Sequence, residues 1–93
     1  MTETQRGGRG KRASLADISL HSWAILGAPD VTAARARRFA EVGLRAGTRV
    51  FVLLDTVGGG RVISVGDRDG LEQSRIALDR NTLRRLPATA TST

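Results

Sequence analysis

The chain has 93 residues, which is the length of a single domain. It contains no cysteine, which excludes disulfide bonds, thiolate catalysis and cysteine metal sites, and fits a reducing cytoplasm. A formal net charge of +6 and a pI near 11.6 raise the question of an acidic partner, such as nucleic acid or a membrane surface.

Residues 1–13 are predicted to form a disordered tail. Four basic residues and one acidic residue give this glycine-rich stretch half of the net charge of the chain. The run RGGRGKR resembles the start of an RGG-type RNA-binding segment, but it occurs once and no aromatic residue is interleaved with it. A solvated tail therefore describes this stretch better than a nucleic acid site does.

The stretch after the tail is predicted to join the fold and not to act as a targeting signal. Asp17 and His21 interrupt its apolar residues, and the longest clean apolar run is Trp23–Leu26. That run is far too short for a secretory signal, or for a membrane span of about 20 residues. We expect Trp23–Leu26 to be the first strand, ended by the Gly-Ala-Pro that follows it. The expected location is cytoplasmic.

A short helix with a glycine-terminated end is predicted next. Ala33–Glu41 contains mostly good helix formers, and Asp30 is the expected N-cap. Gly43 stands where a residue of positive φ would end the helix. In such an ending Leu44 would fold back against Phe39.

The rest of the chain is predicted to form short strands joined by turns. The expected strands are Thr48–Leu54, Arg61–Val65 and Arg75–Leu78. In the first of these, alternation places Val50, Val52 and Leu54 on one face and Phe51 and Leu53 on the other. The three glycines at 58–60 are expected to make a hairpin turn.

The C-terminal part is predicted to hold one helical turn and a last strand. The helical turn is expected at Asp79–Leu83, the strand around Leu86, a mobile loop at 66–70, and a frayed tail at 88–93. These elements describe a mainly β protein with one helix. The expected fold is a small SH3-like β-barrel of about five strands, with a helical insertion after the first strand. The domain spans 14–87 between flexible tails.

No residue pattern indicates catalysis, a cofactor or a metal site. The glycines at 58–60 lack the lysine and Ser/Thr of a P-loop, and the acidic stretch at 67–70 does not fit the EF-hand register. His21 is the only histidine, so it cannot build a transition-metal site alone. The serines lack a histidine–acid constellation. The chain is therefore expected to be non-enzymatic, with no cofactor and no metal ligand.

The run Arg38–Gly47, with the sequence RFAEVGLRAG, resembles the Arg-Leu-x-x-Leu-Gly-Leu-x-Pro-Gly signature of the FeoA family. As in that family, an apolar strand follows it at Val50–Leu54. Two further stretches are similar to the family's opening segment and its penultimate strand and turn: LAD at 15–17 and IALDR at 76–80. The resemblance covers about 14–87. Ala46 departs from the family's usual proline, which leaves the turn to Gly47.

The resemblance implies a small cytosolic SH3-like protein that serves ferrous iron uptake. Such a protein would dock on the cytoplasmic GTPase-containing part of a FeoB-type membrane transporter, and would reach the membrane only through that partner. Contact is expected at the helix end and the turn after it. The expected partner-binding residues are Arg38, Val42, Leu44, Arg45 and Ala46. The two arginines would form the rim of the patch, and iron itself would not be coordinated. The same side chains could instead belong to the core, and for Phe39 and Val42 the core is the preferred interpretation.

Two other functions fit the same sequence. The barrel also resembles the C-terminal regulatory domain of DtxR-like metal-dependent repressors, so the chain could bind such a regulator. No DNA-reading helix-turn-helix is present, which argues against a complete repressor. A small basic nucleic-acid-binding barrel is the other possibility. The three Trp and Phe residues are expected inside the fold, and this argues against it.

Overall fold

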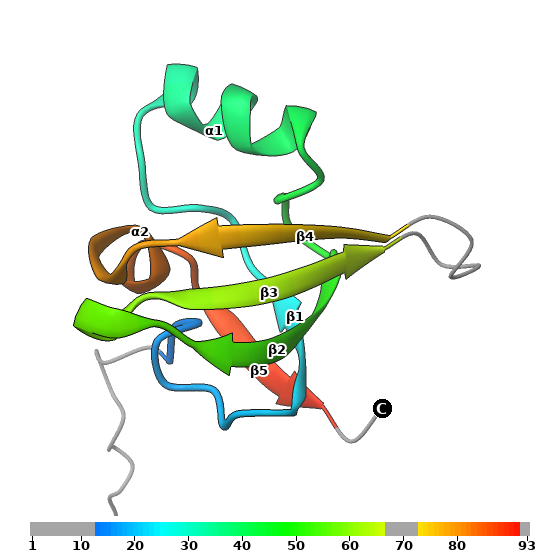
Figure 1. Cartoon of the computed structure of the whole chain (residues 1–93). Helices are drawn as coiled ribbons and strands as arrows, with labels where there is room; N and C mark the ends of the chain where they lie inside the picture. The colour runs from blue at the N-terminus through cyan, green and yellow to red at the C-terminus, as the bar shows by residue number, and fades with distance from the viewer. Residues whose placement is uncertain (1–12, 67–72, 92–93) are drawn as a thin grey trace, which may run out of the picture.

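One antiparallel sheet, with a helix standing apart from it, makes up the fold (Figure 1). The computed structural model describes residues 13–66 and 73–91. Neighbouring strands pair in the order β4-β3-β2-β1-β5. The strands are β1 (Trp23–Leu26), β2 (Arg49–Asp55), β3 (Arg61–Gly66), β4 (Gln73–Leu78) and β5 (Ala88–Thr91). The helices are α1 (Ala33–Glu41) and α2 (Arg80–Arg84), with a 3-10 turn η1 (Val57–Gly59) between β2 and β3.

The predicted fold class is confirmed: the described chain is mainly β, with one main helix after the first strand. The edge strands β4 and β5 do not pair with each other, so the sheet is not closed into a complete barrel. Residues 1–12 of the predicted tail, and all but the first residue of the predicted loop at 66–70, lie outside the described residues.

The core lies on one face of the sheet and is completed by residues from the segments before β1 and after β4. Alternate strand positions turn their side chains to this face, as the period of two requires. The buried apolar residues are Leu15, Ile18, Ala24, Leu26, Leu44, Val50, Val52, Ile63, Val65, Leu83, Leu86 and Ala88. Ile76 and Leu78 of β4 pack against this cluster, as predicted.

The predicted frayed tail at 88–93 is wrong over 88–91, because Ala88–Thr91 form β5, and residues 92–93 lie outside the described residues. This strand pairs antiparallel with β1, and Leu86, where the last strand was expected, is a buried residue just before it. The physical reason is that β1 would otherwise leave one row of backbone hydrogen-bonding groups unpaired. The folded domain therefore extends beyond the predicted boundary at 87.

Leu54 was expected to share one face of β2 with Val50 and Val52, and this is also wrong. Val50 and Val52 face the core, but the register between β2 and β3 shifts between Val52 and Leu54. Such a bulge adds one residue to one strand and reverses the alternation beyond it. Leu54 is consequently 48% exposed.

The N-cap of helix α1 lies two residues after the predicted one. The N-cap is Thr32, whose Oγ1 accepts a hydrogen bond from the Arg35 N–H at 3.3 Å. Asp30 contacts Arg85 instead of the helix: its backbone N–H donates to the Arg85 carbonyl at 2.8 Å, and its carboxylate lies 3.7 Å from the Arg85 guanidinium. The prediction of Asp30 as the cap is therefore wrong.

The predicted end of α1 is confirmed. Gly43 has a φ of 94°, and its N–H donates to the Ala40 carbonyl at 3.0 Å. The Leu44 N–H donates to the Phe39 carbonyl at 2.8 Å. These two bonds form a Schellman motif, which satisfies carbonyls that the last helical turn leaves open.

The predicted glycine hairpin between β2 and β3 is confirmed and closes one end of the sheet. Gly58 and Gly59 have positive φ, and a Cβ on Gly60 would lie 2.8 Å from the Leu78 carbonyl oxygen. Arg61, directly after the turn, has a side chain only 14% exposed. Its guanidinium donates to the carbonyls of Leu15 and Ile18, and to the Asp55 carboxylate. One arginine thus fixes the N-terminal segment to the sheet.

The predicted helical turn after β4 is confirmed as α2. Asp79 is its N-cap, and the carboxylate accepts the Thr82 N–H at 2.8 Å. Hydrogen bonds from the side chain and backbone of Thr82 hold the pKa of Asp79 below its ordinary value of 3.8. The charge of Arg35 on α1 acts in the same direction.

Candidate partner-binding surface

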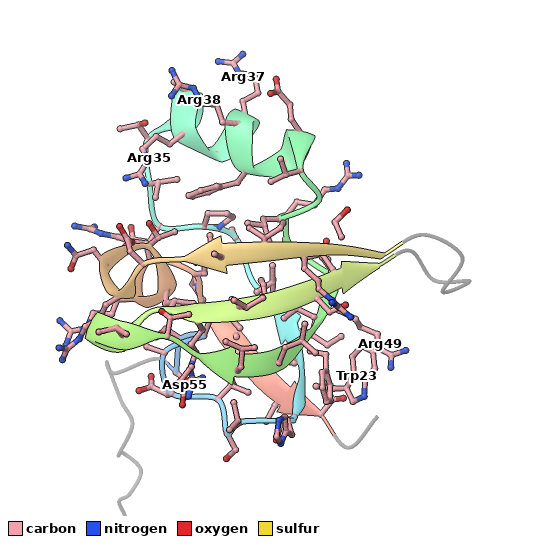
Figure 2. All side chains as sticks on the ribbon, in the orientation of Figure 1. Trp23, Arg35, Arg37, Arg38, Arg49 and Asp55 are labelled. Carbon is pink, nitrogen blue, oxygen red and sulfur yellow. The ribbon has the colours of Figure 1, made fainter. Side chains whose placement is uncertain are left out.

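Four of the five predicted partner-binding residues are exposed at the C-terminal end of α1. Val42, the C-cap of the helix, is 52% exposed, and Arg38 precedes it by one helical turn. Arg45 and Ala46 are exposed in the turn that follows. We name these four residues the helix-end surface. Figure 2 shows the Arg38 side chain pointing away from the sheet.

Leu44 does not belong to this surface. It is 1% exposed and lies in the core, so a partner docking on the folded chain cannot reach it. The cause is the Schellman ending, which turns the residue after Gly43 back toward the body of the protein. The preferred core interpretation is correct for Phe39, which is half-buried against the core, and wrong for Val42.

The turn that carries Arg45 and Ala46 is held by backbone hydrogen bonds to β1. The Gly47 N–H donates to the Leu26 carbonyl at 2.8 Å, and the Leu26 N–H donates to the Thr48 carbonyl at 2.9 Å. Gly47 has a φ of 89°, which a residue with a side chain rarely adopts. The helix-end surface is therefore presented by a backbone whose position is fixed at both ends.

Arginines outnumber carboxylates on α1, which carries Arg35, Arg37 and Arg38 against Glu41. Arg35, Arg37 and Arg38 extend from α1 in Figure 2. Within 13–66 and 73–91 there are ten arginines and five carboxylates. Neither Arg38 nor Arg45 forms an ion pair with a residue in those ranges. Their charges are thus available to an acidic partner.

A second group of residues was missed from the sequence. Trp23 and Phe51 were expected inside, but they face outward from β1 and β2, opposite the buried Ala24, Val50 and Val52. Their ring centroids lie 5.1 Å apart. The signal was present in the alternation, since Trp23 and Phe51 occupy the positions between the small or branched core residues.

Arginine and histidine side chains extend this outward aromatic group. The Arg49 guanidinium carbon lies 4.7 Å from the centroid of the Trp23 ring, and Figure 2 shows the two side chains together. His21, exposed before β1, stacks on Phe51 with centroids 6.4 Å apart. We name these four residues the aromatic shelf.

The described residues contain no group of three histidine, cysteine or acidic side chains that could hold a metal ion. The shallow cleft beside Ser14, Asp30 and Arg84 is lined mainly by polar atoms. Across 13–66 and 73–91, neither helix has the length and apolar character that a membrane crossing requires.

No protein-family model and no curated protein matches this sequence. Three solved structures do match its fold. A crystal structure of an iron uptake regulatory protein, FeoA, has a TM-score of 0.70 and 20% identity, over 85% of this chain and 97% of that chain. A FeoA protein of Stenotrophomonas maltophilia, described in complex with zinc as a prokaryotic SH3 domain protein, has a TM-score of 0.63 and 27% identity, over 83% and 89%.

The third structure is the solution structure of a FeoA protein from Chlorobium tepidum. It has a TM-score of 0.60 and 22% identity, over 84% of this chain and 70% of that chain. All three structures are of FeoA proteins, and each match covers more than four fifths of this chain. The resemblance of this chain to the FeoA family, with its SH3-like fold, is thereby confirmed.

Proposed function

We propose that the chain is a non-enzymatic accessory protein of ferrous iron transport. Its structural neighbours support this role, since one is described as an iron uptake regulatory protein and another as a candidate ferrous iron transport activating factor. A fold by itself does not determine function, so the proposal also needs a surface that can bind a partner protein. The helix-end surface supplies it.

The partner in this proposal is the cytoplasmic GTPase-containing part of a FeoB-type transporter. The observation that carries the proposal is an apolar C-cap, Val42, left 52% exposed between Arg38 and Arg45. An exposed apolar side chain with a charged rim is the usual composition of a protein–protein interface. The arginines would steer and orient the encounter, and Val42 and Ala46 would supply contact area.

This role gives the chain a cytoplasmic location and contact with the membrane only through its partner. Iron is then the cargo of the transporter, and the proposal assigns no iron ligand to this chain. The zinc bound to the Stenotrophomonas maltophilia protein belongs to that complex.

Reversing one charge of the helix-end surface tests the proposal. We expect Arg45→Glu to weaken binding to the purified GTPase-containing region by about tenfold or more, because it puts a repulsive charge on the rim. Titration calorimetry measures the affinity, and circular dichroism should be unchanged because Arg45 is exposed and unpaired with described residues.

Arg80→Glu is a matched control. Arg80 is exposed at the start of α2, at the other end of the sheet from the helix-end surface (Figure 1). A glutamate is favourable at a helix N-terminus, so this reversal should not harm the fold. Equal weakening by both variants would show a general charge effect. An unchanged affinity of Arg45→Glu would remove Arg45 from the interface, and no binding by the parent chain would refute the docking proposal.

A further inference from the structure

The aromatic shelf lies outside the helix-end surface and is not used by the proposed function. Trp23 and Phe51 are directly opposite each other in the β1–β2 register, and both are half-buried. Ile25, Leu54 and Val62 add apolar side chains to the same outward face, and Ser64 of β3 pairs with Phe51. Leu54 is the most exposed of the three apolar residues, at 48%. This side of the sheet therefore offers a patch of apolar and aromatic surface to solvent.

The shelf is held in place before any partner arrives. Trp23 and Phe51 are tilted by 58° in contact with each other, and the Arg49 guanidinium covers the Trp23 ring. The backbone of His21, which has a positive φ of 63°, is held by its own N–H, which donates to the Val52 carbonyl at 2.8 Å. Aromatic side chains with few free torsions lose little entropy on binding. The shelf has the rigidity of a recognition site.

The charge of this side of the sheet is of one sign. Outward-facing positions of the five strands include Arg49 and Arg75 and no carboxylate, among the described residues. Two possible occupants are disfavoured by this. A second copy of the chain would bring the same positive face, and the chain's own N-terminal stretch carries four basic residues. The occupant should bring negative charge.

An acidic protein segment fits the shelf better than a nucleic acid does. A base would need a free aromatic face for stacking. Here one face of Trp23 lies under Arg49, and Phe51 stacks with His21. Apolar side chains need no free ring face, and they can pack on Ile25 and Leu54. Carboxylates beside them can pair with Arg49 in two-pronged geometry.

We propose that the aromatic shelf binds an acidic peptide segment of another protein, with an apolar side chain of that segment packed beside Trp23 and a carboxylate paired with Arg49. This site goes beyond the proposed function, because it requires no transporter.

The only tryptophan of the chain reports on the site directly. The full chain is titrated with a short peptide rich in glutamate and leucine that has no aromatic residue, and the emission of Trp23 is recorded. We expect a saturable change in that emission. Arg49→Gln should weaken the affinity by about tenfold, as expected for a central interface arginine. Arg49→Lys should recover only part of it, since lysine keeps the charge and loses the planar guanidinium.

Three controls decide the outcome. Arg80→Gln, on α2, should leave the titration unchanged, and a peptide with lysine in place of each glutamate should not bind. Circular dichroism of each variant confirms that it is folded. The proposal is overturned if Trp23 emission does not respond to the acidic peptide, or if Arg49→Gln binds it as the parent chain does. Tighter binding of an oligouridylate than of the peptide would likewise overturn it in favour of nucleic acid.

Discussion

Replacing Gly43 by alanine tests the joint between α1 and the sheet. The φ of 94° at this position is costly for a residue with a Cβ, by roughly 1–2 kcal/mol. The new Cβ would also lie 3.1 Å from Val65 Cγ1, so the core must shift slightly, at about 1 kcal/mol. The unfolded chain loses some freedom, which offsets about 0.4–1 kcal/mol. We expect a net loss of about 2 kcal/mol in the free energy of unfolding.

Substitutions at two other glycines separate the backbone cost of positive φ from the cost of the contact with Val65. Gly47 has a φ of 89° and no atom within 4 Å of a Cβ, so Gly47→Ala should show the backbone cost without the clash, about 1 kcal/mol. Gly27 has no positive φ, and a Cβ there would meet Pro87 Cβ at an ordinary 3.4 Å. Gly27→Ala should therefore change stability by less than about 0.5 kcal/mol.

Urea denaturation followed by circular dichroism measures all three free energies, with unchanged m-values as the sign that the two-state transition is retained. The expected order of destabilisation is Gly43→Ala, then Gly47→Ala, then Gly27→Ala. If Gly43→Ala were no worse than Gly47→Ala, the contact with Val65 would be irrelevant. If neither lost stability, the argument from positive φ would be wrong for this chain.

Two further substitutions test side chains that hold the fold together. Arg61→Ala leaves two carbonyls of the N-terminal segment without their donor, so the free energy of unfolding in urea should fall by about 3 kcal/mol, with Arg61→Lys intermediate. A loss below about 0.5 kcal/mol would show that water replaces the guanidinium freely. For Asp79 the folded pKa is depressed, so its contribution to stability is present above the ordinary value of 3.8 and is lost as the pH falls through the lower, folded value. Asp79→Asn keeps a capping side chain for Thr82. In parallel thermal melts this variant should lose less stability over that acid range than the parent chain does. Identical pH profiles of the two proteins would show that Asp79 is not the group responsible.

The sequence was most informative where structure is decided locally. The end of α1 was predicted because a glycine after a short helix has few alternatives, and the strand β2 because its apolar run is long for so small a chain. β5 was missed because ATAT has no apolar signal, and its strand character comes from pairing with β1, far away in sequence. The bulge that exposes Leu54 depends likewise on the partner strand.

The exposure of the five predicted contact residues differs between the two apolar ones that flank Gly43. Val42 was named as a contact residue although a core position was preferred for it, and it is exposed; Leu44 was named as a contact residue and is buried. The Schellman geometry explains both, since the residue after Gly43 returns to the core and the C-cap before it remains on the rim. The aromatic shelf was missed because large aromatics were assumed to be needed inside, while the core is filled by aliphatic residues.

The two surfaces share one piece of backbone, which decides what each substitution can show. The turn from Arg45 to Thr48 leads directly into Arg49, and its hydrogen bonds to Leu26 tie it to the strand that carries Trp23. Arg45 and Arg49 are exposed side chains on this support, so we expect a change of either to alter the proposed recognition while the backbone stays in place. Gly43 and Gly47 act on the support itself. A partner that engages the helix-end surface and one that engages the aromatic shelf can therefore be told apart by the arginine variants alone, and the glycine variants should disturb both.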